Sequence, residues 1–332
     1  MGIAISELIP KKEISLQELK GKKLAIDASP VIYQFLSSIR QPDGTPLMDN
    51  KGDVTSHIMG LSTRIPKLME QGIKLAFVFD GKPPEAKFGE SQIREQRKRK
   101  AEEKLKEAIK EEDTESIAKY KKQSIRITED IVKESEEFVK ALGLPTIRAP
   151  SEAEAQAAFM AEKGDVYAIV SQDHDSLLYN APRMIKNITV SPKRKIKGMY
   201  VSVHPEMIEL KDVHKNMKIN QDQLLALSIL VGTDYNPGGV KRIGPKTALK
   251  LVQEHKSFEK VFANVEAEFD WKKVYATFKS MPIMKNYQLK WKEPDLDKIK
   301  KILLKRDFSE ERVDKLLERL QPKQQKELDK WF

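Results

Sequence analysis

Short apolar runs alternate with longer amphipathic segments along the first half of the chain. The runs at 24–26, 76–79 and 168–170 contain only apolar residues and are bounded by polar or turn-forming residues. Runs of this length are typical of strands buried on both faces of a sheet. The segments between them have helical spacing. We therefore expect an α/β fold with a mostly parallel central sheet and helices on both faces.

The pattern over residues 22–80 predicts a strand, a helix, a loop, a second helix and a second strand. Residues 41–46 form the loop, because their sequence, QPDGTP, is rich in turn-forming residues. Pro66 lies inside the second helical pattern. We expect it to kink that helix or to end a turn there.

Residues 82–130 are dense in Lys, Arg and Glu and poor in aromatic residues, and Arg97 to Lys100 form the most basic run. One interpretation is a solvated helix stabilised by ion pairs between residues four apart. The alternative is a helical arch over a nucleic-acid path. Lys87 and Arg94 are seven residues apart, two turns along one helix face, and follow Asp80 closely enough to lean over a site there.

Two further segments are basic and rich in turns. Residues 191–203 predict a basic hairpin or loop. Residues 222–256 predict a helix, a glycine-rich loop over 232–244 and another helix from Thr247. Glycines before a helix N-terminus expose backbone N–H groups that suit a phosphate, although an ordinary helix–loop–helix connection has the same pattern. Three lysines in this segment add positive charge that can contact phosphates without recognising bases: Lys241, Lys246 and Lys250.

The amino-acid composition favours a polyanionic binding partner. The 332 residues can form one large domain or two, and 60 Lys and Arg against 50 Asp and Glu give a net charge of +10. A merely soluble or heat-stable charged protein is the alternative. The absence of cysteine excludes disulfides, thiol catalysis and zinc-thiolate sites. With no apolar run of membrane-spanning length and no signal-peptide pattern, we expect an intracellular protein, cytoplasmic in a prokaryote and nuclear in a eukaryote.

Carboxylates occur where the predicted strands end and helices begin. The carboxyl ends of parallel strands meet at one edge of a sheet, so these side chains should converge. Clustered acids repel one another, and a pair of divalent cations relieves that repulsion. The sequence thus predicts a metal site formed by seven acids: Asp27, Asp80, Glu152, Glu154, Asp173, Asp175 and Asp234.

Each acid also has an ordinary structural interpretation as a helix cap or turn residue. Ser151 and Glu154 have the spacing of a capping box, and Glu152 would favour the positive end of the helix dipole. Residues two apart do not share a helix face. We therefore expect one of the two glutamates to bind metal directly and the other through water.

The last residues of the chain suit a protein partner. Gln325 is followed by Leu328 and then by two aromatic residues, Trp331 and Phe332. Such a segment can form one helical turn with an apolar end. It either docks on its own protein or anchors a partner, and the terminal aromatic pair favours the partner.

Together these blocks resemble the flap structure-specific endonucleases of the XPG superfamily. The resemblance follows almost the whole chain in order through the segments LAIDASPVIYQFLSSIRQPDGTPL (24–47), FVFDGKPPEAK (77–87), APSEAEAQAAFMA (149–161), VSQDHDSLLY (170–179), VGTDYNPGGVKRIGPKTALKL (231–251) and QKELDKWF (325–332). Two places depart from the family pattern. Arg242 replaces a glycine before Ile-Gly, and the Leu61-Ser62-Thr63 stretch with Pro66 replaces a more aromatic, proline-free helix.

The resemblance implies a 5′ flap endonuclease with 5′–3′ exonuclease activity that processes Okazaki fragments and acts in DNA repair. The seven acids would bind two Mg²⁺ or Mn²⁺ ions, and Lys87 and Arg94 would be the catalytic basic pair. The 234–250 block would grip duplex phosphates, with K⁺ possible there, and the tail would bind the sliding clamp PCNA. The implied DNA contacts are Gly2, Tyr33, Arg40, Arg64, Lys67, Gly238, Gly239, Lys241, Gly244, Lys246 and Lys250.

The resulting layout is one nuclease domain over 1–320 in a monomer that binds branched DNA with a 5′ flap. It comprises an N-terminal region (1–80), an arch (81–130), an internal region (131–260) containing a helix–two-turn–helix element (222–256), and C-terminal helices (261–320). Residues 321–332 form the clamp-binding tail. Rival interpretations are a related nuclease for bubbles, four-way junctions or nicks, a non-catalytic scaffold on the clamp, and a small-molecule phosphatase.

Overall fold

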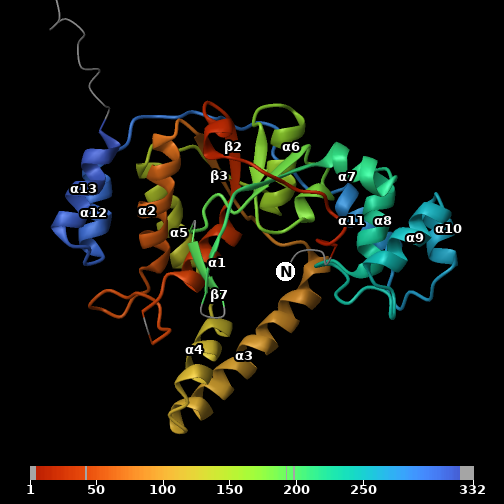
Figure 1. Cartoon of the computed structure of the whole chain (residues 1–332), viewed down its shortest axis with the longest axis horizontal. Helices are drawn as coiled ribbons and strands as arrows, with labels where there is room; N and C mark the ends of the chain where they lie inside the picture. The colour runs from red at the N-terminus through yellow and green to blue at the C-terminus, as the bar shows by residue number, and fades with distance from the viewer. Residues whose placement is uncertain (1–4, 42, 192, 197–198, 322–332) are drawn as a thin grey trace, which may run out of the picture.

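The computed structural model describes residues 5–41, 43–191, 193–196 and 199–321. Its centre is a seven-stranded sheet in which five neighbouring strands are parallel, a sixth pairs antiparallel with them, and a seventh at the edge pairs antiparallel with the sixth (Figure 1). In spatial order the strands are β1 (Lys12–Glu13), β9 (Glu206–Glu209), β6 (Arg183–Lys186), β5 (Ala168–Val170), β2 (Lys23–Asp27), β3 (Lys74–Phe79) and β4 (Thr146–Arg148).

The central strands are buried on both faces, as their continuous apolar runs predict. Along β2, Leu24 and Ile26 join one core while Ala25 joins another on the opposite face. Three helices lie on the first face, α1 (Ala28–Ser38), α2 (Ser56–Glu70) and α5 (Glu129–Ala141), and outside them α12 (Leu296–Lys305) and α13 (Glu310–Leu320) pack against α5 and α2 (Figure 1). The second face is covered by α6 (Ala153–Glu162), so the expected α/β architecture is confirmed.

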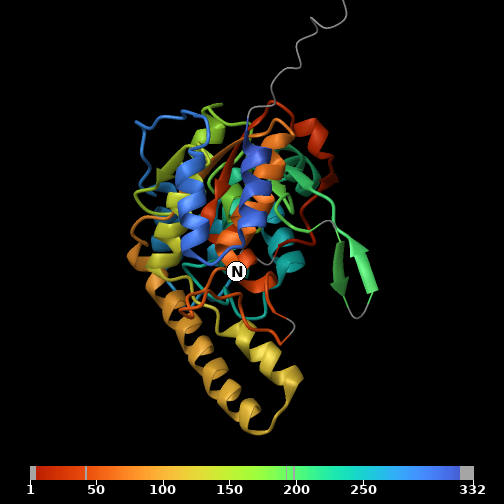
Figure 2. The same ribbon diagram turned by 90° about the vertical axis from the view of Figure 1, so that its left-hand side faces the viewer.

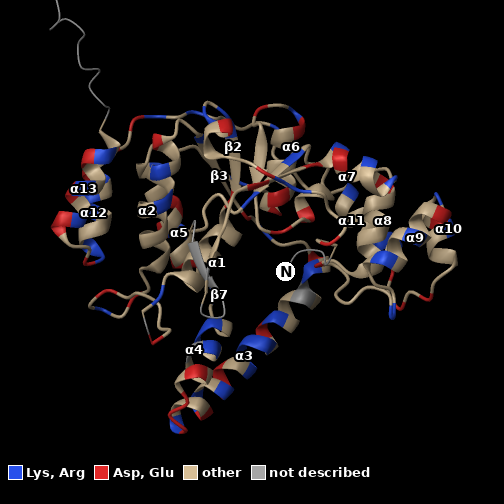
Figure 3. Ribbon diagram, in the orientation of Figure 1, with Lys and Arg blue, Asp and Glu red and all other residues tan. Residues whose placement is uncertain are grey.

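The charged segment after β3 forms a helical hairpin that extends away from the body (Figures 1 and 2). A short 3₁₀ turn, η2 (Glu85–Lys87), leads into α3 (Phe88–Lys110), which returns through α4 (Thr114–Gln123). Both signs of charge occur along the hairpin (Figure 3). Near its base, Arg126 pairs with Glu95 at 2.5 Å and with Glu102 at 3.1 Å. The hairpin is therefore held by ion pairs more than by apolar burial.

A second helical group packs beside β9 and η3 (Asp175–Leu177) around its own apolar core. It contains α7 (Leu210–Met217), α8 (Gln221–Val231), α9 (Pro245–Glu254), α10 (Phe258–Ala263) and α11 (Trp271–Lys279). The predicted basic hairpin is also present, formed by β7 (Lys193–Ile196) and β8 (Met199–Ser202). A last 3₁₀ turn, η1 (Leu16–Leu19), precedes β2.

An irregular strap over residues 281–295 joins the second helical group to α12. The Lys292 amide donates to Gly143 O at 2.9 Å, and the Trp291 indole donates to Leu75 O at 2.8 Å. A Cβ atom on Gly143 would lie 2.1 Å from Lys292 O, so this crossing requires glycine. The strap thus carries the chain back so that α12 and α13 can pack against α5 and α2.

Pro66 does not end its helix. The α2 helix continues through it to Glu70, and the side chains of Ser62 and Thr63 bond back to Met59 O in the turn before it. In the part of the chain that the structure describes, no helix combines the length and the apolar character needed to cross a membrane.

Candidate active site

The seven predicted acids gather at the carboxyl edge of the parallel strands. Asp27 ends β2, Asp80 follows β3, and Asp173 follows β5. Asp175 opens η3, Asp234 follows α8, and the remaining two acids come from the start of α6: Glu152 and Glu154. Because β2 lies between β3 and β5, strands far apart in sequence bring the acids to one place.

The start of α6 differs from the predicted capping box. Glu152, not Ser151, is the N-cap residue, and its side chain makes no capping bond. The Ser151 hydroxyl instead donates to Lys82 O at 3.0 Å. The Ala153 N–H in the first turn of α6 donates to Asp80 Oδ1 at 2.8 Å. Asp80, which follows β3, therefore accepts the hydrogen bond that a capping side chain would accept at the start of α6. The Glu152 carboxylate is left to face the site.

Sequence reasoning missed one residue here. The Ser29 hydroxyl donates to Asp80 Oδ2 at 2.5 Å, so both oxygens of this carboxylate are held. Ser29 lies in the first turn of α1, two residues after Asp27. That proximity to a strand-terminal acid is the signal that could have identified it.

The acids act on one another electrostatically. Burial raises the pKa of Asp27 well above its usual value, and the charges of Asp80 and Asp173 raise it further. Burial also raises the pKa of Glu154, and Asp175 adds to the effect. The cost of keeping these carboxylates charged is thus a property of the cluster.

Two cations from the helical hairpin reach this cluster. Lys87 Nζ lies 2.5 Å from Glu152 Oε2 and 3.5 Å from Asp234 Oδ2. Arg94 Nη2 donates to both oxygens of Asp234, at 2.9 Å and 2.8 Å. Burial alone would lower the pKa of Lys87, but Glu152 and Asp234 outweigh it and raise this pKa above its usual value. The predicted basic pair therefore does lean over the acids.

The donor set suits divalent cations, although the described residues contain no group of three or more acidic or histidine side chains with the close spacing of a formed metal site. Lys87 and Arg94 pair directly with two of the acids, Glu152 and Asp234. Carboxylate oxygens are the ligands that Mg²⁺ and Mn²⁺ prefer. Asp27 Oδ1 is buried without a hydrogen-bond partner. An unpaired, buried, repelled carboxylate oxygen is what a bound cation would satisfy.

Two tyrosines and one histidine lie next to the acidic residues in sequence or in space. The hydroxyls of Tyr179 and Tyr235 lie 2.7 Å apart, and Tyr235 directly follows Asp234. His174, between Asp173 and Asp175, lies 3.2 Å from Lys186 Nζ. Burial and the charge of Lys186 lower the pKa of His174 to about 4, so this imidazole is neutral at neutral pH.

The predicted DNA contacts are spread over the surface rather than gathered at the acids. Tyr33 on α1 is 42% exposed. Arg64 and Lys67 lie on α2, on the side of the molecule opposite to α9 (Figure 1). The Arg40 guanidinium donates to Leu36 O and Gly44 O, so it also holds the loop that follows α1.

The glycine-rich loop after α8 folds back on that helix. Gly238 and Gly239 have positive φ angles, and a Cβ atom on Gly239 would lie 2.3 Å from Leu230 O. Gly244 is the N-cap residue of α9. Three lysines are exposed along this element, and the first of them pairs with Glu268 at 2.6 Å: Lys241, Lys246 and Lys250. The loop therefore presents a cationic, glycine-rich surface beside Asp234.

Some predicted residues fall outside the described part of the chain. These are Gly2 and the four positions of the predicted clamp-binding tail: Gln325, Leu328, Trp331 and Phe332.

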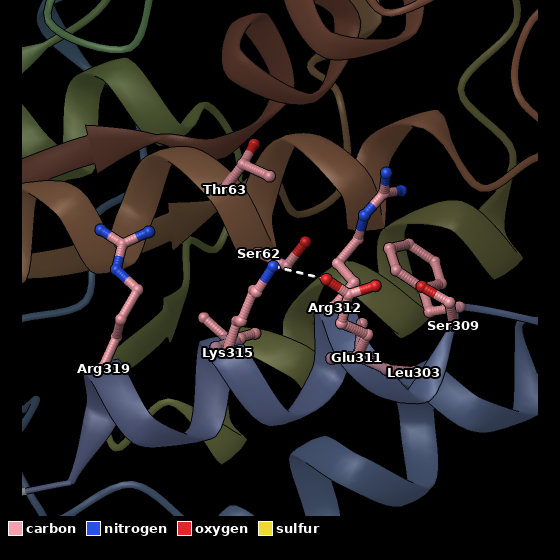
Figure 4. Close-up of a pocket in the computed structure, with 10 residues that line it drawn as sticks. Ser62, Thr63, Leu303, Ser309, Glu311, Arg312, Lys315 and Arg319 are labelled. Atoms are coloured by element: carbon pink, nitrogen blue, oxygen red, sulfur yellow. Dashed lines mark hydrogen bonds and ion pairs between the residues drawn. The ribbon is translucent and has the colours of Figure 1, made fainter.

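A cavity of about 300 Å³ lies between α2 and α13 (Figure 4). Ser62 and Thr63 line it from α2, and Arg312, Lys315 and Arg319 line it from α13. The small side chains of α2, which depart from the aromatic family pattern, therefore border open space. None of the seven clustered acids of the candidate site lines this cavity.

Two family models match the chain. The XPG N-terminal domain matches residues 2–101, and the XPG I-region matches residues 143–234. The first contains Asp27, Asp80 and both hairpin cations, and the second contains the other five acids.

Characterised relatives are similar over the whole length. Flap endonuclease 1 of Pyrococcus abyssi is 49% identical and that of Pyrococcus horikoshii is 48% identical, each alignment covering 100% of this chain and 98% of the relative. Among solved structures, flap endonuclease-1 from Methanococcus jannaschii matches with a TM-score of 0.77 and 42% identity, covering 96% of this chain and 98% of that one.

Proposed function

Because this chain belongs to the XPG family of nucleases and is a structure-specific flap endonuclease, we propose that it cuts 5′ flaps with two divalent cations bound by its clustered acids. The observation that carries this proposal is the meeting of acids from the ends of β2, β3, β5 and α8 and the start of α6 with two cations of the helical hairpin, Lys87 and Arg94. An acidic cluster under a basic hairpin suits a phosphodiester substrate.

Nuclease members of this family depend on metal, and the acids of this chain are the ligands we assign. The proposed ligands are Asp27, Asp80, Glu152, Glu154, Asp173, Asp175 and Asp234, for two Mg²⁺ or Mn²⁺ ions. Such ions, when bound, activate water and neutralise charge on the leaving oxygen. The ligand role explains why buried acids with raised pKa values are kept in this protein.

Lys87 and Arg94 are proposed to stabilise the negative charge of the scissile phosphate. Both cations already reach the carboxylates, so a phosphate at the same edge would lie within their range. Preorganised cations at the place where charge develops lower a transition-state barrier more than they strengthen ground-state binding. No side-chain nucleophile is required.

The duplex part of the substrate is proposed to lie along the glycine-rich element of α8 and α9 and the basic surface of the body. Backbone N–H groups and lysines there contact phosphates without reading bases. K⁺ at this element remains part of the proposal. Arg40, Arg64, Lys67 and a base stacked on Tyr33 would fix the junction, with the 5′ flap directed under the α3–α4 hairpin.

The wider assignments are also proposals. The last residues would bind the sliding clamp PCNA, the enzyme would act as a monomer, and replication and repair would supply its branched DNA. The two relatives from Pyrococcus are archaeal, so we place the enzyme in the cytoplasm.

A substrate panel tests the proposal. Flap, nick, bubble and four-way junction DNA are incubated with Mg²⁺ and, separately, with EDTA. We expect Mg²⁺-dependent cleavage of the flap and loss of all cleavage in EDTA. Preference for bubbles or four-way junctions would move the protein to another branch of the family, and cleavage in EDTA would contradict the metal role.

Substitution of the acids tests the ligand assignment. Asp175→Ala should lower the cleavage rate by at least ~10³-fold while flap binding stays within about threefold, because the carboxylate acts on the reacting phosphate. Asp222→Ala, which removes an exposed acid paired with Lys279 on α11, is the control and should cleave normally. Loss of binding without loss of rate would contradict the assigned role.

A further inference from the structure

The Asp80 carboxylate is fixed more completely than its strand position requires. Ser29 Oγ donates to Oδ2 at 2.5 Å, and the Ala153 N–H donates to Oδ1 at 2.8 Å. The two donors come from the first turns of α1 and α6, and Ser29 lies 51 residues before Asp80 in sequence. Asp80 thus lies between the N-termini of two helices, where the partial positive charges of backbone N–H groups favour an anion.

This arrangement leaves one part of the carboxylate free for a ligand. An ionised carboxylate has about four lone-pair positions, and the two donors use two of them. Hydrogen bonds from opposite sides also fix the rotation of the carboxylate, because turning it would break both. A cation that binds the remaining lone pairs then meets an oriented ligand.

The Ser29 hydroxyl donates to a residue outside its own helix. Ser29 is the second residue of α1, and the N-cap position belongs to Asp27, whose side chain makes no capping hydrogen bond. Its hydroxyl has a single proton, and that proton is used on Asp80. The residue therefore acts across the sheet and not within its helix.

We propose that Ser29 is a positioning residue of the active site, which holds the Asp80 carboxylate in the orientation that binds a divalent cation. Ser29 itself touches neither the cation nor the reacting phosphate. The inference rests on the proposed function, because it requires Asp80 to be a cation ligand. Ser29 lies outside the set of seven acids, and it would influence the chemistry through the hydrogen bond that its hydroxyl donates to Asp80.

The test compares three variants of the full-length enzyme. Ser29→Ala removes the hydroxyl, and Ser29→Thr keeps it. Ser37→Ala is the matched control, because Ser37 lies on the same helix and its hydroxyl bonds only to Gln34 O at 3.0 Å. For each, the rise in Tm on titration with Mg²⁺ gives cation affinity without catalysis, and steady-state cleavage of flap DNA gives kcat and KM.

We expect Ser29→Ala to need about tenfold more Mg²⁺ for half of the Tm rise, since partners of metal ligands typically affect affinity by ~10- to 100-fold. At low Mg²⁺ its kcat falls by about as much, while KM for DNA stays within about twofold because no DNA contact is lost. Ser29→Thr should recover most of the affinity, and Ser37→Ala should match the unsubstituted enzyme.

Two results would overturn the inference. One is an equal Mg²⁺ requirement for Ser29→Ala and Ser37→Ala, and the other is a Ser29→Thr enzyme as impaired as Ser29→Ala. The Tm in EDTA separates a folding defect, which lowers the starting Tm, from lost cation binding, which reduces the rise. If Ser29→Ala cannot be purified, Ser29→Cys, with its weaker donor, replaces it with the same expected direction.

Asp80→Asn separates this inference from the proposed function. Asparagine keeps an oxygen for the Ala153 amide but loses the charge that binds a cation. If Asp80→Asn cleaves normally, the metal role of Asp80 is wrong. If Asp80→Asn is inactive and Ser29→Ala is normal, only the role of Ser29 is wrong.

Discussion

Arg242 adopts a backbone conformation that favours glycine. Its φ angle is 65°, in the left-handed region where a Cβ atom crowds the following carbonyl. The family pattern has glycine at this position. The turn between α8 and α9 imposes this angle, since Val240 N bonds to Leu230 O and Ile243 N bonds to Val240 O on either side of it.

Arg242→Gly should therefore stabilise the protein. Relief of the left-handed strain is worth ~1–2 kcal/mol, and the greater freedom of glycine in the unfolded chain returns part of it, leaving a gain of about 0.5–1 kcal/mol. The measurement is the free energy of unfolding in urea. Arg242→Ala keeps the Cβ atom and should gain nothing; an equal gain for alanine would show that the arginine side chain, and not its backbone, carries the strain.

At this scale the sequence could place acids but not their partners. Asp27, Asp80 and Asp173 were predicted at one edge because each follows an apolar run. The Ser29–Asp80 bond could not be predicted, because it depends on the register of β2 beside β3. The same holds for the Tyr179–Tyr235 pair, whose members come from separate parts of the fold.

Among the elements, the α3–α4 hairpin depends most on charge. Arg126 joins two turns of α3 through Glu95 and Glu102, and each of these side chains is partly exposed. Exposed ion pairs contribute little singly, but one guanidinium that bonds two carboxylates loses its side-chain entropy only once. The hairpin base should accordingly open locally more easily than the sheet opens.

Arg126→Gln should speed amide hydrogen exchange in α3 near Glu95 and Glu102 by about threefold, while the global Tm changes by less than about 2 °C. Hydrogen exchange followed by mass spectrometry measures this. Arg99→Gln is the control, because Arg99 pairs with Glu95 within a single turn of the same helix and bridges no second turn. Equal exchange in the two variants would contradict the bridging role.

Element boundaries were predicted best where the apolar pattern is unambiguous. The strands and helices of residues 22–80 were predicted in their observed order, and the basic hairpin was confirmed. Two local expectations gave way to tertiary structure. Pro66 does not end α2, whose apolar face is buried on both sides of the proline by Ile65 and Leu68. The capping box expected at Ser151 does not form, because Asp80, which follows β3, accepts the hydrogen bond from the start of α6 instead.

In the whole molecule, Arg306 joins segments that are far apart in sequence. It follows α12 and pairs with Asp49 at 2.8 Å, with Asp53 at 2.6 Å and with Glu134 on α5 at 2.6 Å. Glu134 also lies 2.9 Å from the buried imidazole of His57 on α2. One guanidinium thus connects the C-terminal helices to the first face of the sheet.

Arg306→Ala should lower Tm by roughly 5 °C at neutral pH, because it removes the guanidinium from the partly buried carboxylates of Asp49 and Glu134. Burial acts to raise the pKa of Glu134, but hydrogen bonds from His57 and Arg306 outweigh it and lower this pKa below its ordinary value of 4.5. A depressed carboxyl pKa stabilises the fold above the unfolded-state value and ceases to do so as pH falls through the folded-state value.

The Tm difference between Arg306→Ala and the unsubstituted protein should therefore be full near neutral pH and shrink below pH 4.5. Thermal unfolding across pH measures it. Lys300→Ala, which removes an exposed pair with Asp314 at 3.8 Å, should change Tm little at any pH. A difference that stays constant with pH would show that lost packing, and not the ion pairs, accounts for the effect.

The fold class could be predicted from sequence, but the strand order and the positions of α12 and α13 could not. The strand order places β2 between β3 and β5, and no local pattern encodes that neighbourhood. The positions of α12 and α13 depend on the strap at 281–295, which has no periodicity of its own.

That strap determines when the protein can fold during its synthesis. Ile299, Leu303 and Val313 share a core with Leu24 and Ile58, so this core is completed only after residue 313 has left the ribosome. Contacts between such distant residues form slowly, since a long loop must close first. Until then α2 and α5 expose the apolar side chains that α12 and α13 later bury, and such exposed surface favours aggregation of the nascent chain.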